Sequence, residues 1–448
     1  MAAAAVTPAW VAEALAVAAA QTPAPVAWLE RLRLTARSQV GKVPWPNRRQ
    51  EAWRYTSLTA LEVAEMQHGG APSPAATEAA RAAWAQMPAL GHGPRLLFVD
   101  GHHVASAGTV PAGVTTASLA TILAAPAAPW HAHLGSLGLQ EDQPLAALNL
   151  ALLQDAAVVH VDAGVCVNET IELTFITQAT APPRLTQPRL LVVAEADSRL
   201  QVVARHLDLG VGASFTNLVA ELILGNRAEL VFWRLQEGSE AATHTATVAA
   251  QVQAQAHLHT GLLALGGSLV RQSTQVALLG ADAQCDWAGL QLGRGTAHLD
   301  MQVQLRHVGL RTRSSQLFKQ LLHDRSSGTF GGQVLVAPGA DGACAEQLSR
   351  SLLLDPGASA QTQPQLEILT DDVRCSHGAT IGNLDPAALF YLQSRGLDRS
   401  AATALLTFAF AQEVLDRLQE PLARSLFSTT VGRWLGMSTD AVLPGRRS

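Results

Sequence analysis

The chain has 448 residues, of which 48% are hydrophobic, and its formal net charge is −5. This length predicts two to three domains with enough chain to bury a sizeable core. The largest basic clusters are the pairs Arg48-Arg49 and Arg446-Arg447, so the chain lacks the electrostatic footprint of a nucleic-acid-binding protein. We therefore expect its partners to be proteins.

The first twenty residues are apolar, but they lack a basic leader and contain Pro8 and Glu13. We therefore expect neither a secretory signal nor a membrane span, and we expect a cytoplasmic location. The four cysteines include no Cys-x-x-Cys pair, which argues against a disulfide framework.

Residues 1–156 are expected to form a mainly helical N-terminal region with one short hairpin. Apolar residues recur with helical spacing over residues 11–19 and 26–38, an alanine-rich helix is expected over 75–86, and another over 145–153. Between them, RLLFVDGHHVA has the pattern of a strand, an Asp-Gly turn and a second strand.

Residues 157–383 have a different character, because short apolar runs alternate there with a few polar residues or glycines and helical signals almost vanish. Such closely spaced strands fit a sandwich, a barrel or a solenoid. The absence of long connections and a spacing of roughly 20–25 residues per rung favour a solenoid. Periodicity alone leaves the solenoid and the sandwich about equally supported.

The segment from Asp371 to Leu397 brings a thiol, an imidazole and two carboxylates together just before a helix. If it begins as a strand, Cys375 and His377 share one face, and Arg374 and Ser376 share the other. Sulfur and nitrogen ligands suit zinc, copper or the iron of a cluster, but two ligands are too few for a closed site. The alternative is a buried thiol beside a hydrogen-bonded histidine.

Residues 384–448 are expected to be helical. Asp385 can cap a helix that has Pro386 at its first position, and Gly396 stands where such a helix ends. A second helix is expected over residues 399–418, with an apolar band wider than one stripe. That band either packs within the chain or docks a partner. The residues singled out for docking are Leu405, Leu406, Phe410, Val414 and Leu418.

The other cysteines and histidines carry weaker hypotheses. Cys166 and Cys285 are expected in the core and Cys344 is expected to be structural or incidental. Three histidine pairs offer imidazoles, but with no cysteine or carboxylate recognised nearby they are expected to be hydrogen-bonded surface rings. These pairs are His102 with His103, His131 with His133, and His257 with His259; His307 and His323 have no assigned role.

Motifs for common catalytic chemistry are missing from the sequence. It contains no G-x-x-x-x-G-K-[ST] phosphate loop, no H-E-x-x-H and no G-x-S-x-G. We therefore expect no ATP hydrolysis by the phosphate-loop route in this chain, and no enzyme activity of its own.

The string CSHGATIG, followed by LD and ALFYLQSRG, resembles the C-terminal signature of the SufB/SufD family, the scaffold subunits of the SUF iron–sulfur cluster assembly system. PQLEILTDDVRCSHGAT, AEQLSRSLLLDPGA, SSGTFGGQVLV and EAWRYTSL also match, so the resemblance covers most of the chain. It implies a right-handed parallel β-helix between N-terminal and C-terminal helical regions.

Within this family the chain is more similar to the SufD branch, because LLTFAFAQEVLDRL and the Arg-Tyr-Thr after Trp53 resemble that branch and thiols are few. The resemblance implies a SufB-like partner bound through the β-helix and a SufC-like ATPase bound by residues 386–435. It also implies that Cys375 and His377 line the interface where a transient iron–sulfur cluster forms. Whether a flavin binds is left open.

Two alternatives remain at this point. One is a SufB-like scaffold that holds the cluster by itself, which would need more thiols at the site. The other is an unrelated β-helix enzyme acting on a polysaccharide, for which clustered carboxylates are expected along the solenoid. Asp371 and Asp372 are adjacent, and consecutive strand residues face opposite ways, which disfavours a paired acid and base.

Overall fold

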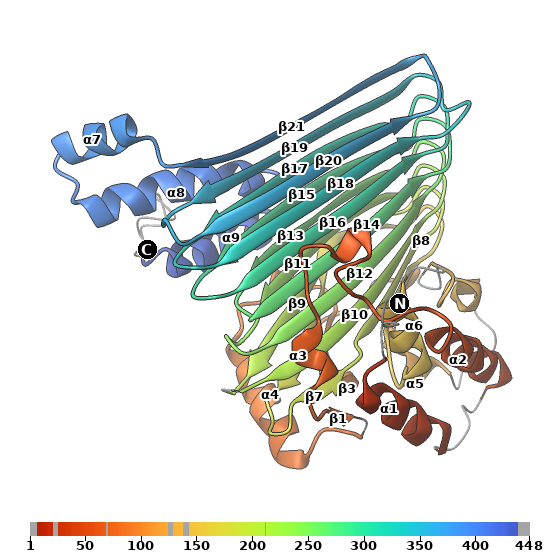
Figure 1. Cartoon of the computed structure of the whole chain (residues 1–448). Helices are drawn as coiled ribbons and strands as arrows, with labels where there is room; N and C mark the ends of the chain where they lie inside the picture. The colour runs from red at the N-terminus through yellow and green to blue at the C-terminus, as the bar shows by residue number, and fades with distance from the viewer. Residues whose placement is uncertain are drawn as a thin grey trace, which may run out of the picture.

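The computed structural model describes residues 7–20, 26–68, 70–123, 129–137, 143–210 and 212–437. The strands form a parallel β-solenoid of about eight turns, with helices at both ends of the chain (Figure 1). The mainly β solenoid that the family resemblance implied is therefore confirmed. Within the described residues, no helix has the length and apolar character needed to cross a membrane.

Each turn contributes one strand to each of two facing sheets. The first sheet contains, in spatial order, β4 (Val114–Ser118), β5 (Ala157–Val161), β8 (Arg189–Ala194), β10 (Ser214–Leu224), β12 (Thr243–Val252), β14 (Leu269–Leu278), β16 (His298–His307), β18 (Ser327–Val336) and β20 (Ser359–Ile368). Off this path, β7 (Arg184–Thr186) pairs with β10 and with β1 (Gln67–His68).

The second sheet begins with a hairpin and ends at the strand that carries the cysteine and histidine motif. Its order is β3 (His102–Ala107), β2 (Arg95–Val99), β6 (Cys166–Gln178), β9 (Arg199–Leu209), β11 (Glu229–Glu237), β13 (His257–Leu265), β15 (Gln284–Gly293), β17 (Arg313–Leu322), β19 (Ala343–Leu353) and β21 (Val373–Asn383). The N-terminal region thus supplies β1, β2, β3 and β4 to the sheets.

The repeat is longer than the spacing expected from the sequence. Thr243 pairs with Leu269, and Leu269 pairs with His298, which are steps of 26 and 29 residues. The expectation of roughly 20–25 residues per rung was therefore wrong. Each turn needs two strands of about ten residues and two connecting turns, and the short apolar runs in the sequence show only the inward-facing part of each strand.

The turns that lead from the first sheet into the second repeat one backbone conformation. Asp197, Arg227, Gln255, Asp282 and Arg311 all have positive φ, between 54° and 62°. Each of their N–H groups donates to a carbonyl of the following turn, as Asp197 does to Asn226. These five turns are therefore stacked one above another by backbone hydrogen bonds, although the five residues themselves are exposed or partly exposed.

The main core lies between the two sheets. Alternate strand residues point inward, so Leu230 and Phe232 of β11 join this core while Val231 and Trp233 point outward. The apolar inward face makes burial of hydrophobic surface the main stabilising contribution.

The N-terminal helices cover the outer faces of the first turns (Figure 1). They are α1 (Ala9–Ala20), α2 (Ala27–Val40), α3 (Thr59–Glu62), α4 (Pro74–Gln86), α5 (Leu119–Ile122) and α6 (Pro144–Ala151), with short 3₁₀ turns η1 (Glu51–Trp53) and η2 (Pro129–Ala132). The four helices and the hairpin expected from the sequence are confirmed. Arg189 and Glu221, both on strands of the solenoid, form a fully buried ion pair with 2.7 Å between Nη2 and Oε2. Glu221 also accepts the backbone N–H groups of Gly135 and Leu137, so this carboxylate joins the N-terminal region to the solenoid.

The C-terminal helices are α7 (Pro386–Ser394), α8 (Arg399–Leu415) and α9 (Pro421–Trp434). As expected, Asp385 caps α7, accepting the N–H of Ala387, and Gly396 follows the helix with a φ of 94°. α8 and α9 pack on the outer face of the second sheet against residues such as Trp233, whereas α7 stands away from the solenoid and buries none of its residues (Figure 1).

Candidate functional site

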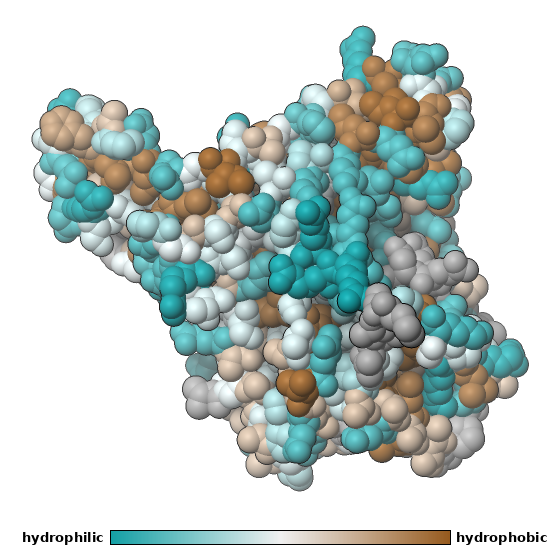
Figure 2. All heavy atoms as spheres, in the orientation of Figure 1, coloured by the Kyte–Doolittle hydropathy of each residue, from teal (hydrophilic) through white to brown (hydrophobic). Residues whose placement is uncertain are grey.

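The last turn of the solenoid is uncovered. β20 and β21 are the terminal strands of their sheets, and none of their residues is fully buried. Ile368, Leu369 and Ile381 are 39%, 50% and 44% exposed although all three are apolar. Figure 2 shows hydrophobic surface gathered at the upper end of these last turns. Two open strand edges beside exposed apolar side chains form a surface suited to pairing with another chain.

Cys375 and His377 both lie on β21, which is extended as expected. Cys375 pairs in register with Ala345 of β19, a fully buried residue, and packs against the small apolar cluster that Ala345 belongs to. His377 is two residues further along, so it faces the same way, toward the open end of the solenoid interior. The strand therefore presents both side chains on one face, and His377 is exposed.

Below His377 lies a column of buried glutamines. His377 pairs in register with Gln347, which is 2% exposed and donates through Nε2 to Oε1 of Gln316 at 3.0 Å. Within the described part of the chain, Oε1 of Gln347 has no hydrogen-bond partner. The imidazole of His377 is therefore next to a buried polar side chain, Gln347, whose Oε1 is available to accept a hydrogen bond.

The environment of Cys375 does not favour a thiolate. Partial burial raises the pKa of the Cys375 thiol, and its neighbour Cys344 adds to this effect. Cys344 pairs with Arg374 and so lies on the opposite face of the sheet. Cys375 is therefore expected to be protonated at neutral pH, which makes it a weak nucleophile in the isolated chain.

Cys375 and His377 stand alone as ligands within the described part of the chain. No other described histidine, cysteine or acid groups with them in an arrangement of three or more metal ligands. Cys285 lies on β15, three strands away in the same sheet, and is fully buried. The chain thus offers two soft ligands where a cluster normally takes four.

The other cysteines follow the expectations in part. Cys285 is buried in the core as predicted, and burial raises the pKa of its thiol. The prediction for Cys166 was wrong, because this residue is exposed at the start of β6. The register between β6 and β9 shifts between Cys166 and Thr170, so local alternation does not continue to the strand end. Cys344 is partly buried.

Most of the histidines are held by neighbours. His103 Nε2 is 2.8 Å from the Ser106 hydroxyl, His131 stacks on Trp28, and His307 bonds to the hydroxyls of Thr312 and Ser314. His257 and His259 differ, because folding places a carboxylate of β15 beside both rings. The sequence analysis missed this carboxylate since it lies almost thirty residues further along.

The five residues singled out for docking are not equally available. Four of them lie on α8, which ends at Leu415 and not at residue 418 as expected, and Leu418 follows the helix. Val414 and Leu418 are each 1% exposed and belong to the apolar cluster against the second sheet, so in this fold they stabilise the chain itself. Phe410 is partly buried in the same cluster, and Leu406 is partly buried. Leu405 remains 41% exposed. The sequence could not separate these roles, since the apolar band runs most of the way around α8.

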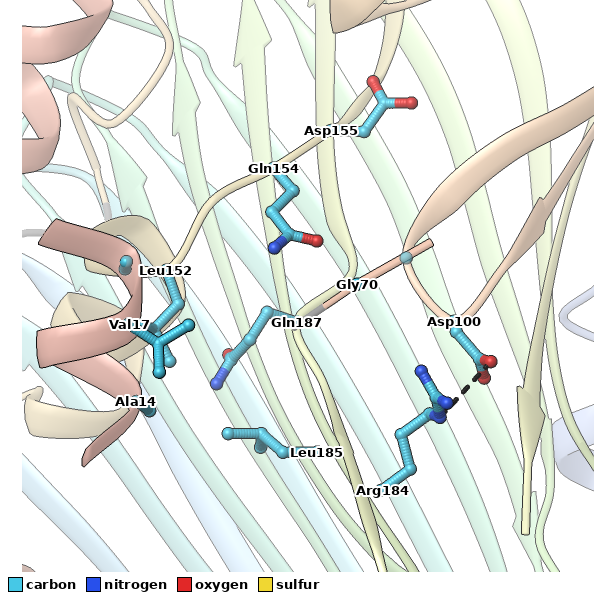
Figure 3. Close-up of a pocket in the computed structure, with 12 residues that line it drawn as sticks. Ala14, Val17, Gly70, Asp100, Leu152, Gln154, Asp155, Arg184, Leu185 and Gln187 are labelled. Carbon is cyan, nitrogen blue, oxygen red and sulfur yellow. Dashed lines mark ion pairs between the residues drawn. The ribbon is translucent and has the colours of Figure 1, made fainter. Parts of the chain in front are cut away.

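Two hollows lie away from the open end. Figure 3 shows a small pocket beside α1, where Asp100 faces Arg184 at 3.5 Å. A wider groove runs along the outer face of the first sheet and is lined largely by glutamines and threonines. Among the described residues that line this groove, Glu51 is the single carboxylate. Glycosidases need a pair of carboxylates, so this groove does not support the polysaccharide-enzyme alternative.

Comparison with known proteins identifies the family. A family model described as "SUF system FeS cluster assembly, SufBD core domain" matches residues 175–410, and one for the "SufBD protein N-terminal region" matches residues 19–173. The chain belongs to the SufB/SufD family. This family assignment agrees with the resemblance found in the sequence, and it places the cysteine and histidine motif within the core domain of an iron–sulfur cluster assembly protein.

Individual relatives give the same assignment. An iron–sulfur cluster assembly SufBD family protein of Synechocystis is 30% identical over 404 residues, covering 87% of each chain. The iron–sulfur cluster assembly protein SufD of Escherichia coli is 32% identical over 38% of this chain and 40% of its own length. SufD of Bacillus subtilis is 26% identical over 62% of this chain and 64% of its own length.

The burial of the four cysteines predicts an order of thiol reactivity in this SufB/SufD family member. In the folded chain, Cys166 should be alkylated first, Cys344 and Cys375 more slowly, and Cys285 only after unfolding. Timed iodoacetamide labelling followed by peptide mass spectrometry measures this order. Rapid native labelling of Cys285, or protection of Cys166, would contradict the arrangement described here.

Proposed function

We propose that this chain is a SufD-like accessory scaffold that forms one half of an iron–sulfur cluster assembly interface. The observation that carries the proposal is that two soft metal ligands lie on a strand whose outer edge is unpaired. Cys375 and His377 share one face of β21, the terminal strand of its sheet, without further ligands among the described residues. The relatives named SufD belong to the same family as this chain.

The open last turn favours a second solenoid as the partner. β20 and β21 have unpaired edges, and another chain with the same strand spacing can extend both sheets at once. A SufB-like subunit would fit this role and bring further thiolates toward His377. The nascent cluster is then a cargo shared across the interface.

The two ligands have different roles in this proposal. His377 is exposed, and imidazole replaces thiolate on iron in some cluster sites, so His377 is the stronger candidate for a cluster ligand or a cluster-handling base. Cys375 is partly buried and its thiol pKa is raised, so it would transfer sulfur only if the partner changed its surroundings.

The competing function within the family is an autonomous SufB-like scaffold. It would need at least two more cluster ligands close to Cys375, and Cys344 points to the opposite face of the sheet. The lack of converging thiols in the described residues is the reason for preferring the accessory role.

The C-terminal helices are proposed to bind a SufC-like ATPase, which would supply the energy input. The exposed apolar residues of this region are Phe390 and Tyr391 on α7, at 73% and 57%, Leu405 on α8 and Leu422 on α9. α7 buries none of its residues and stands clear of the solenoid (Figure 1). We include a cytoplasmic location in the proposal.

The half-site proposal predicts how cluster formation depends on His377. Anaerobic reconstitution of the isolated chain with iron and sulfide should give little stable cluster, because two protein ligands are present where four are normal. Adding a SufB-like partner should produce the visible absorption of a cluster, and His377→Ala should reduce it severalfold. Ser376→Ala, at the neighbouring position on the opposite face, is the matched control and should behave like wild type.

Because His377 is exposed, its substitution should leave the melting temperature and partner binding near wild type. Stoichiometric cluster on the isolated chain would refute the half-site and favour the autonomous scaffold. Unchanged cluster formation in the His377→Ala complex would show that His377 takes no part in binding the cluster.

The docking proposal predicts that Phe390→Ala weakens binding of a SufC-like ATPase. Loss of a central aromatic contact typically costs about 2 kcal/mol, or about 30-fold in the dissociation constant. Val63→Ala, at an exposed apolar residue of the N-terminal region, is the control. Calorimetric titration of the purified proteins measures both variants, and equal affinities for Phe390→Ala and wild type would exclude α7 from the interface.

Point substitutions are needed here because deleting residues 386–448 would also remove α8 and α9. These helices cover Trp233, Leu290 and Leu317 on the outer face of the second sheet. Their loss would expose a large apolar surface, and a failure of the truncated chain to bind would then have two explanations.

A further inference from the structure

A cluster of two imidazoles and one carboxylate lies on the outer face of the second sheet, away from the last turn. His257 and His259 are at the start of β13, and Asp286 is on the neighbouring strand β15. The parallel register pairs His259 directly with Asp286. Leu258 and Cys285 point into the core, so alternation directs all three polar side chains outward.

The three side chains converge on one point. Nε2 of His257 lies 2.8 Å from Oδ2 of Asp286, and Nδ1 of His259 lies 3.3 Å from the same oxygen. The two rings are tilted against each other with their centroids 3.7 Å apart. In a tetrahedral shell with bonds of about 2.0 Å, ligand atoms are about 3.3 Å apart. The two nitrogen–oxygen separations are thus close to the value that one ion requires, and all three ligand atoms lie within 4.8 Å of one another.

The cluster is accessible from one side. The side chains of His257, His259 and Asp286 are 28%, 13% and 40% exposed. Gln419, in the connection between α8 and α9, reaches to 3.5 Å from Nδ1 of His259 and covers part of the cluster. An ion can therefore enter from solvent.

We propose that His257, His259 and Asp286 bind one divalent first-row transition metal ion, such as Zn²⁺, with water completing the shell. Two imidazoles and one carboxylate suit this class of ion, whereas Mg²⁺ and Ca²⁺ prefer oxygen ligands throughout. Three protein ligands with an open position are typical of accessible rather than closed structural zinc sites. This site is independent of the proposed cluster interface, since it is on a different turn and uses different residues.

A second group with similar composition provides the contrast. His323, Asp324 and Asp355 also lie within reach of one ion, but they include only one imidazole. Their carboxylates already accept backbone N–H groups, Asp324 from Gly295 and Asp355 from Asp324. Metal binding there would compete with two turn hydrogen bonds, so this group serves as the matched control.

The test is metal titration of the full-length, tag-free chain after chelator treatment, with Zn²⁺ by calorimetry and with Co²⁺ by visible absorption. Wild type should bind one equivalent and show the d–d bands of a Co²⁺ ion with low coordination number. His257→Gln and Asp286→Asn should each weaken this binding by at least 10- to 100-fold, since loss of even an outer-shell partner has effects of that size. His323→Gln should bind like wild type.

Circular dichroism checks that each variant retains the wild-type fold. The proposal is overturned if folded wild type binds neither ion with one-to-one stoichiometry, or if His257→Gln and Asp286→Asn bind as tightly as wild type. To separate this site from the cluster interface, the titration is repeated with His377→Ala, which should leave the one-equivalent binding unchanged. Loss of that binding in His377→Ala would assign the ion to β21 and also overturn the proposal.

Discussion

In-register stacking of parallel strands holds the solenoid together and places its side chains. Each internal strand of the solenoid uses its backbone groups on two neighbours, and the turns from the first sheet into the second hydrogen-bond to the turns that follow them. The arrangement satisfies buried backbone groups at every level except the ends. At the C-terminal end, β20 and β21 are left with unpaired edges, and this is where the cysteine and histidine motif lies.

Stacking also explains why the polar clusters form in columns. Residues 26 to 33 positions apart become neighbours on adjacent strands, so each cluster is assembled from successive turns. Asp282 and Arg311 pair across adjacent turns, and Gln320 donates to Gln291 in the interior. Asp286 reaches His257 and His259 by the same route. The column that contains Gln316 and Gln347 continues to His377, where it meets the open end.

The sequence predicted local features well because local interactions determine them. Asp385, Pro386 and Gly396 define the ends of α7 through capping and backbone preference, and alternation correctly placed Cys375 and His377 on one face. The family motif supplied the solenoid, which periodicity alone did not distinguish from a sandwich. The pairing register between neighbouring strands depends on the length of the repeat, which the sequence did not show correctly. Asp286 was therefore not recognised as the neighbour of His259. Val414 was predicted to dock a partner. Its burial arises from tertiary packing on the second sheet, which the sequence alone does not reveal.

We propose that the open last turn is the surface where a second SufB/SufD solenoid extends the two sheets. Hydrogen–deuterium exchange of this chain, alone and in complex with a SufB-like partner, tests this pairing. Complex formation should slow exchange of backbone amides in residues 359–383, where both terminal strands have unpaired edges. Unchanged exchange in residues 359–383, together with new protection elsewhere on the chain, would contradict it.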